Sequence, residues 1–216
     1  MVRVKICGIR SSEDAVAAAK AGADEIGFHV ELNGARAPLL PANVAKMIAT
    51  LPRGISSVMV TSVTDPDRLV SLAKETSADI LQLYGDVTPQ QIREVKAVLP
   101  KIIVWKVLNV SDENSIAEAK EYEGVADAIA LDTLNKATGA RGGTGKTHDW
   151  NISKKIVGSV SIPVILAGGL NPDNVADGIA TVQPHGVDVN SGVSNPDGSK
   201  DFEKVRLFVE RARDAF

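Results

Sequence analysis

The stretch VRVKICGIRSSEDAVAAAKAG, residues 2–22, contains one strand-like and one helix-like segment in succession. Residues 2–7 alternate apolar and polar side chains and are rich in β-branched types, whereas residues 11–22 carry apolar side chains at helical spacing. A strand followed directly by a helix favours a parallel crossover unit, because the helix returns the chain to the edge of the sheet where the strand began. The remainder of the chain repeats this unit.

Seven more strand–helix pairs follow. The predicted strands are 24–31, 55–61, 79–84, 102–108, 127–132, 163–169 and 186–192, and the predicted helices after them are 41–51, 65–77, 88–99, 111–122, 149–157, 171–182 and 201–215. Side-chain oxygens suited to capping a helix occur at five of the starts, at Ser11 or Ser12, Asp65, Thr88, Ser111 and Asn171. Eight such units predict a closed (β/α)8 TIM barrel, with an open doubly wound sheet as the alternative. We expect a single domain over residues 1–216.

Composition narrows the class of protein. The net charge is −3, the isoelectric point is near 5.7, and the basic residues are scattered, so nucleic acid is not an expected partner. The chain shows neither a signal peptide nor an apolar run of membrane-spanning length, which predicts a cytoplasmic protein without a membrane partner. One cysteine and three separated histidines give no metal-ligand spacing. Both a monomer and a homodimer fit these features.

Alternation along the predicted strands places several polar side chains inside the barrel. The set expected to face the axis is Lys5, Cys7, Gln82, Tyr84, Lys106, Asp132 and Asp188. Buried charges are costly unless they are paired, so the lysines and aspartates are expected to neutralise one another, and purely structural ion pairs are one reading of them. Cys7 and Asp132 fall at the carboxyl ends of their strands, where barrel enzymes build active sites.

Two loops at that same face predict a phosphate site. Gly168 and Gly169 follow the seventh strand, and Ser191 and Gly192 follow the eighth. Glycines let backbone N–H groups approach an anion closely, and these two loops commonly bind phosphate in this fold. A small phosphorylated metabolite is therefore the expected substrate; the alternative is that the glycines only form tight turns.

The glycine-rich stretch GARGGTGKTHDW, residues 139–150, is not a nucleotide-binding P-loop. Ala140 stands where the first glycine of that motif is required, and residues 134–141 separate the predicted strand from the glycines. We expect Gly142 to Thr147 to belong to a flexible loop that covers the ligand.

Five ordered motifs resemble the phosphoribosylanthranilate isomerase family. They are KICGIR at 5–10, ALDT at 130–133, GGTGKTHDW at 142–150, ILAGGLNPDNV at 165–175 and GVDVNSGV at 186–193. The resemblance implies a (β/α)8 barrel without cofactor or metal that converts an aminoaldose phosphate to an aminoketose phosphate in tryptophan biosynthesis. By matching position, it implies Cys7 as general base and Asp132 as general acid. It also implies Arg36 as the anthranilate contact, Asp188 as a second barrel aspartate, and Gly168, Gly169, Ser191 and Gly192 as phosphate contacts.

The chemistry of this rearrangement needs one acid for the ring oxygen and one base for the proton at C2. Cys7 would act as a thiolate, which nearby lysines favour, and Asp132 would hold a proton, which a low dielectric favours. The alternatives are a buried structural thiol at Cys7 and an ion pair of Asp132 with Lys5 or Lys106.

The chain departs from the family pattern mainly after the second strand. The usual GFIF..SPR is GFHVELNGAR at 27–36, Tyr84 replaces a histidine, and Ser194 replaces a glutamate. His29 points inward by alternation, as a polar contact to a different substrate or as a hydrogen-bonded loop residue; His148 and His185 are read as non-catalytic. Two other functions stay open: an isomerase of the same chemistry on another amino-sugar phosphate, and a non-catalytic phosphosugar-binding barrel.

Overall fold

Eight parallel strands form a closed barrel. The computed structural model describes residues 1–35, 37–133 and 147–215, and within them every strand pairs with its sequence neighbours, while β1 pairs with β8. The strands are β1 (Arg3–Ile6), β2 (Glu25–His29), β3 (Ser56–Thr61), β4 (Ile80–Leu83), β5 (Ile103–Val110), β6 (Ala128–Thr133), β7 (Val164–Leu166) and β8 (Gly186–Val189). The predicted TIM barrel is confirmed, and closure excludes the open sheet.

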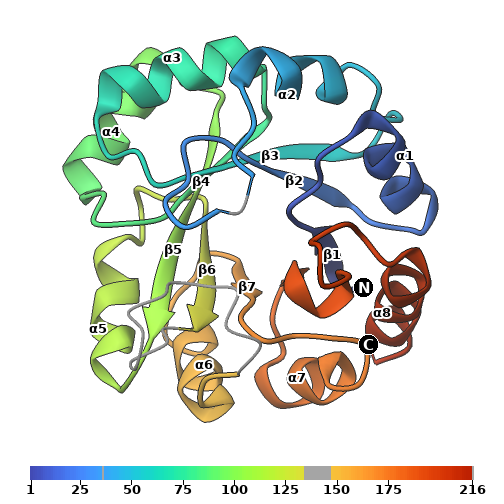
Figure 1. The fold of residues 1–216 in the computed structure, drawn as a ribbon. Helices are drawn as coiled ribbons and strands as arrows, with labels where there is room; N and C mark the ends of the chain where they lie inside the picture. The colour runs from blue at the N-terminus through green and yellow to red at the C-terminus, as the bar shows by residue number, and fades with distance from the viewer. Residues whose placement is uncertain (36, 134–146, 216) are drawn as a thin grey trace.

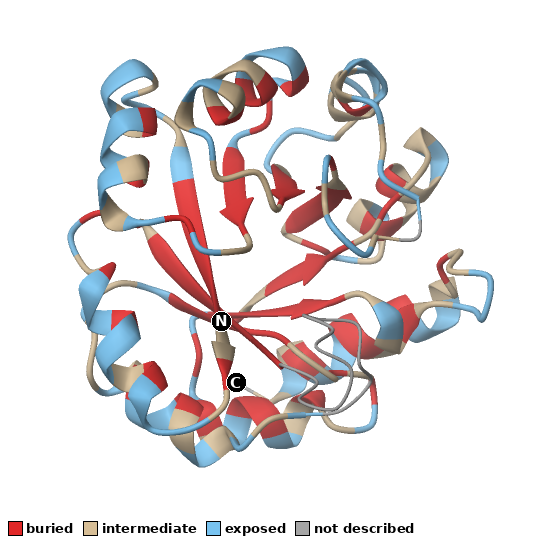
Figure 2. Cartoon of the chain, turned by 60° about the vertical axis from the view of Figure 1, so that its left-hand side comes forward, coloured by how far each residue is buried: buried red, intermediate tan, exposed pale blue. Residues whose placement is uncertain are grey.

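Helices surround the strands as an outer ring (Figure 1). Each described strand is followed by one: α1 (Ser12–Lys20), α2 (Pro41–Ile48), α3 (Pro66–Thr76), α4 (Pro89–Val98), α5 (Asn114–Glu121), α6 (Trp150–Val157), α7 (Val175–Val182) and α8 (Phe202–Asp214). A short 3-10 helix, η1 (Ser191–Val193), precedes α8. Because the sheet closes between its first and last strands, the chain begins and ends side by side (Figures 1 and 2).

Several helix starts follow from local sequence. Ser11 and Asp65 accept hydrogen bonds from backbone N–H groups of the first turn, and Thr88 forms a reciprocal capping box with Gln91. Ser111 and Asn171 do not cap as expected, because α5 and α7 begin three or more residues later in the chain. None of the described helices has the length and apolar content needed to cross a membrane.

Strand alternation separates two apolar layers. Val4, Ile6, Leu81 and Leu83 join the large cluster between strands and helices, whereas Cys7, Ala128 and Ala130 belong to a smaller cluster inside the barrel. The helices correspondingly bury one side and expose the other, while the strands are buried almost throughout (Figure 2). The predicted facing of β1, β4 and β6 is thus confirmed, and these strands aim their polar residues at the axis.

The prediction for Lys106 is wrong. Trp105 and Val107 fill the barrel interior, so Lys106 between them faces the helices. Its ammonium donates to the carbonyl of Gly85 at 2.6 Å and lies 5.2 Å from the centre of the Tyr122 ring. Burial of Trp105 and Val107 in the interior apolar cluster is favourable, and on the other face of β5 the Lys106 ammonium gains a carbonyl acceptor and an aromatic ring.

Candidate active site

Cys7 and Asp132 lie at the carboxyl ends of their strands, as predicted. Cys7 directly follows β1 and is held there by its backbone N–H, which donates to the carbonyl of Val189 on β8 at 2.8 Å. Asp132 is the penultimate residue of β6. Both side chains are buried, with 5% and 4% of their residue surface exposed. Because both side chains are buried, electrostatic interactions with them are stronger than they would be in water.

Lys5 and Asp188 form the predicted ion pair inside the barrel. They are directly opposite in the register of β1 and β8, and Nζ of Lys5 donates to Oδ2 of Asp188 at 2.7 Å. Burial alone would lower the pKa of Lys5, but the negative charge of the hydrogen-bonded Asp188 carboxylate outweighs it and raises that pKa. Oδ1 of Asp188 is buried and has no hydrogen-bond partner among the described residues, although buried polar atoms are nearly always paired.

The Cys7 thiol keeps its proton in this environment. Burial raises its pKa, and the opposing effects of Lys5 and Lys200 do not compensate. The expectation that nearby lysines hold Cys7 as a thiolate is therefore wrong for this structure, because desolvation of the anion is the larger effect and Asp188 adds to it. A base that acts through this sulfur must first lose its proton.

Asp132 is biased toward the protonated form, as predicted. Burial raises its pKa, although hydrogen bonds from the Tyr84 hydroxyl and the Thr133 N–H act in the opposite direction. The hydroxyl lies 2.8 Å from Oδ2 and the N–H 2.7 Å from Oδ1. These two donors fix the plane of the carboxyl group, and no ion pair forms between Asp132 and Lys106, which faces the helices.

Tyr84 connects the two ends of the site. It packs against the interior cluster that contains Cys7, and its hydroxyl contacts Asp132. Burial is the main reason that the pKa of this hydroxyl lies well above its ordinary value, and the negative charge of Asp188 adds to it. Cys7, Asp132 and Asp188 therefore share one interior region, which is the geometry that an acid and a base need to act on one small molecule.

The loops after β7 and β8 pack against each other and against Asp132. A Cβ at Gly168 would lie 2.9 Å from Oδ1 of Asp132, and the φ angles of Gly168 and Gly169 are +80° and +72°. A Cβ at Gly192 would lie 1.9 Å from the carbonyl oxygen of Leu170. Only glycine fits these positions, and Gly168, in the loop after β7, borders Asp132.

Sequence analysis missed Lys200 as a member of this region. It is buried, and its ammonium donates to Asn190 and to Ser194 within 3.0 Å. Burial lowers its pKa to about 8, although Cys7 and Asp188 act in the opposite direction. Lys200 follows the exposed segment 195–197, where lysine usually faces solvent, so no pattern pointed to it.

His29 also contacts the site, as its inward facing predicts. Its Nε2 lies 3.4 Å from Sγ of Cys7. His148 lies apart from the thiol and bonds to Thr133 and Ser153. Arg36, together with residues 142–146 of the predicted covering loop, lies outside the described residues.

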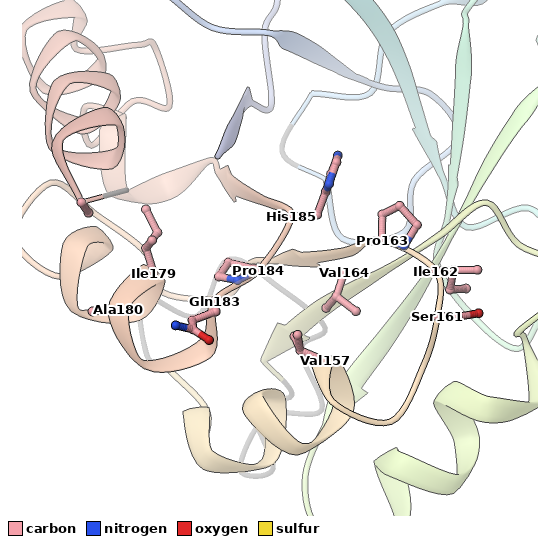
Figure 3. Close-up of a pocket in the computed structure, with 11 residues that line it drawn as sticks. Val157, Ser161, Ile162, Pro163, Val164, Ile179, Ala180, Gln183, Pro184 and His185 are labelled. Carbon is pink, nitrogen blue, oxygen red and sulfur yellow. The ribbon is translucent and has the colours of Figure 1, made fainter. Parts of the chain in front are cut away.

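A separate pocket occupies the opposite end of the barrel. Its volume is about 710 Å³, and it is lined by the start of β7, the residues before β8 and the ends of α6 and α7, including Val157, Pro163, Val164, Gln183 and His185 (Figure 3). Within this lining His185 is the one titratable side chain. The lining of this pocket lacks the paired acid and base found at the carboxyl ends of the strands. Residues at the opposite end of a barrel serve stability rather than chemistry.

Comparison with known proteins identifies the relatives of the chain. The sequence model of the N-(5'phosphoribosyl)anthranilate (PRA) isomerase family matches residues 4–211. An N-(5'-phosphoribosyl)anthranilate isomerase of Methanocella arvoryzae is 42% identical over 214 residues, covering 99% of each chain. The phosphoribosyl anthranilate isomerase of Thermotoga maritima superposes with a TM-score of 0.88 at 32% identity, over 99% of this chain and 100% of that one.

A second solved relative holds a ligand. It is a phosphoribosyl anthranilate isomerase in complex with reduced 1-(o-carboxyphenylamino)-1-deoxyribulose 5-phosphate. It is 30% identical to this chain with a TM-score of 0.85, over 99% of this chain and 100% of that one.

Proposed function

The chain belongs to the N-(5'-phosphoribosyl)anthranilate isomerase family, and from this premise we propose that Cys7 and Asp132 are its general base and general acid. The reaction is the aldose–ketose isomerisation of N-(5'-phosphoribosyl)anthranilate in tryptophan biosynthesis. The observation that carries the assignment is the convergence of a buried thiol and a buried carboxyl group on one interior region, joined by Tyr84.

The proposed sequence of proton transfers follows from these positions. Asp132, protonated, donates to the ring oxygen of the ribose as the ring opens. Cys7, as a thiolate, removes the proton at C2 and leaves an enolamine, which becomes the aminoketose when C1 is protonated. The raised pKa of Asp132 supports its role as the donor, and the two groups project from β6 and β1, on different sides of a sugar held between them.

The substrate phosphate is proposed to bind at the loops after β7 and β8. The proposed contacts are Gly168, Gly169, Ser191 and Gly192. Gly168 borders the acid and Gly192 packs against Leu170 of the other loop, so the two loops lie side by side. Glycine lets backbone N–H groups approach an anion closely. Asp188 is proposed to contact the sugar through its free Oδ1. The proposal that Arg36 contacts the anthranilate carboxylate rests on the sequence resemblance.

Growth tests the function directly. A tryptophan auxotroph that lacks this isomerase should grow when it carries the chain, and should fail to grow with Cys7→Ala. Failure of the well-folded wild-type chain would redirect the assignment to another amino-sugar phosphate.

The proposal also covers the domain organisation, the oligomeric state and the cellular compartment of the protein. A single domain over residues 1–216, acting in the cytoplasm as a monomer or a homodimer, is supported by one barrel that includes every described strand and by a free thiol that must stay reduced. Light scattering on the purified chain distinguishes the two oligomeric states.

A further inference from the structure

Asn109 lies near the carboxyl end of β5, beside the proposed acid. Trp105 and Val107 on this strand face the barrel interior, and Asn109 is the next side chain of the same parity. In the register of β5 and β6, Asn109 lies directly opposite Asp132. The backbones of neighbouring strands are about 4.8 Å apart, so the two side chains are immediate neighbours. The strand predicted from sequence ended at residue 108, and Asn109 was therefore missed.

The amide of Asn109 contains an unsatisfied hydrogen-bonding atom. Its Oδ1 is buried and accepts no hydrogen bond from any residue that the structure describes. Buried polar atoms are nearly always paired, because an atom that loses water without gaining a partner is unfavourable. The residue as a whole is only partly buried, so part of its side chain stays accessible. An external group that donates a hydrogen bond would satisfy this oxygen.

Two further acceptor atoms inside the barrel have the same property. Oε1 of Gln82 on β4 and Oδ1 of Asp188 on β8 are also buried without a donor in the described part of the chain. Both residues have inward parity, since the residues on either side of each pack between strands and helices. The remaining atom of this kind among the described residues, Nε1 of Trp150, lies at the start of α6. The interior therefore has acceptors in excess.

An excess of acceptors indicates the chemistry of the ligand. Hydroxyl groups of a sugar can donate hydrogen bonds to such oxygens, whereas an ionised carboxylate or phosphate offers acceptors only. Gln82 is 1% exposed and lies two residues before Tyr84, one layer deeper in the barrel than the acid. Asn109 is level with Asp132. Of the two amides, Asn109 is therefore the one that a sugar held against the acid can reach.

We propose that Asn109 binds the sugar of the substrate by accepting a hydrogen bond at its amide oxygen, an inference that rests on the proposed function. Because Asp132 protonates the ring oxygen, the ribose lies against the carboxyl end of β6, next to Asn109 on β5. A ribose hydroxyl donates to Oδ1, and this bond helps to orient the ring toward the Asp132 carboxyl group. The contact favours a sugar phosphate over an anion that lacks sugar hydroxyls.

Binding of D-ribulose 5-phosphate tests this contact without turnover. Asn109→Leu keeps the approximate size and branching of the side chain and removes the acceptor. The Kd for D-ribulose 5-phosphate, measured by calorimetric titration, should rise about tenfold, because a sugar hydroxyl is left without its partner. The Kd for inorganic phosphate, which carries no sugar, should change less than about twofold. For N-(5'-phosphoribosyl)anthranilate, kcat/KM should also fall about tenfold.

Stability separates a binding role from a structural one. Leucine leaves no unpaired amide inside the barrel, so Asn109→Leu should unfold at the same or a higher urea concentration than the wild type. A side chain that supported the fold would instead lose stability and affinity together. Asn114→Leu makes the same substitution at an exposed position on α5, and this control should bind both ligands like the wild type. Asn109→Ala removes the acceptor without adding bulk and should reproduce the weaker sugar binding.

The outcomes distinguish this contact from the proposed function. A wild type that binds D-ribulose 5-phosphate in this Asn109-dependent way, but does not turn over N-(5'-phosphoribosyl)anthranilate, would refute the isomerase function and keep the sugar contact. The contact itself is overturned if folded Asn109→Leu and Asn109→Ala bind D-ribulose 5-phosphate within twofold of the wild type. It is also overturned if sugar phosphate and inorganic phosphate weaken equally, or if the wild type binds both with the same Kd.

Discussion

Replacing Asp188 with asparagine should leave a buried ammonium without a counter-charge. Lys5 is fully buried and its Nζ lies 2.7 Å from Asp188. Breaking a buried pair by removing one partner costs about 3–5 kcal/mol, and because asparagine still offers an acceptor, we expect the lower end of that range. A loss of about 3 kcal/mol changes the unfolding equilibrium constant roughly 150-fold.

The pH dependence gives this prediction its sign. In the wild type the pKa of Lys5 is raised, so its contribution to stability is present below the unfolded value near 10.5 and is lost as pH rises through the folded pKa. In Asp188→Asn burial dominates and lowers that pKa. The variant then regains stability as pH rises toward 10.5, because its folded state releases the proton first. Urea denaturation at pH 7 and pH 9.5 should therefore show a larger deficit at pH 7.

An exposed ion pair supplies the matched control. Arg211 and Asp173 are also 2.7 Å apart, but the Asp173 side chain is 90% exposed, so Asp173→Asn should cost less than about 1 kcal/mol. Lys5→Met in the Asp188→Asn background should recover part of the loss, since no unpaired ammonium remains. Equal deficits in Asp188→Asn and Asp173→Asn, or a deficit that is the same at both pH values, would refute the reasoning.

Three further outcomes are expected. Tyr84→Phe removes a hydrogen bond that lowers the pKa of Asp132. The alkaline limb of the kcat/KM profile reports loss of the proton from this acid, so it should move to higher pH by about one unit. An alkaline limb at the same or a lower pH would count against Asp132 as the proton donor. Because the pKa of His148 is lowered to about 4 from 6.5, the unfolded chain binds its proton first as pH falls between these values. The wild type should then lose up to about 3 kcal/mol relative to His148→Gln from pH 6.5 to 4, measured by urea midpoints, and parallel curves would contradict this. In Gly192→Ala the new Cβ would meet the Leu170 carbonyl at 1.9 Å and push the loops after β7 and β8 apart. If these loops bind the substrate phosphate as proposed, KM should rise about tenfold or more with a smaller change in kcat. An unchanged KM would count against the proposed phosphate contacts.

Much of the barrel could be predicted because the spacing of apolar residues within each segment and the order of the segments along the chain indicate the same fold. Period-two strands alternate with helical segments eight times, and the inward and outward faces of β1, β4 and β6 follow from which parity carries the bulky apolar residues. The rule failed on β5, where both parities are apolar except for Lys106 and Asn109. An aromatic residue and a lysine compete there for the interior, and only the packed neighbours decide between them.

The positions of the candidate site residues were predictable, and their protonation states less so. Cys7, Asp132 and the Lys5–Asp188 pair follow from strand position, but the state of the thiol depends on how desolvation compares with two lysines and one aspartate. That balance is set by distances that the sequence does not contain. Lys200 was missed for the same reason, because its burial depends on how the loop before α8 folds back over Asn190 and Ser194.

The assignment of Cys7 as base and Asp132 as acid is tested most directly by steady-state turnover of N-(5'-phosphoribosyl)anthranilate by Cys7→Ala and Asp132→Asn. Each variant, shown by circular dichroism to keep the fold, should lose about 10²–10⁴-fold in kcat. A folded variant of either kind that turns over within tenfold of the wild type would contradict the account.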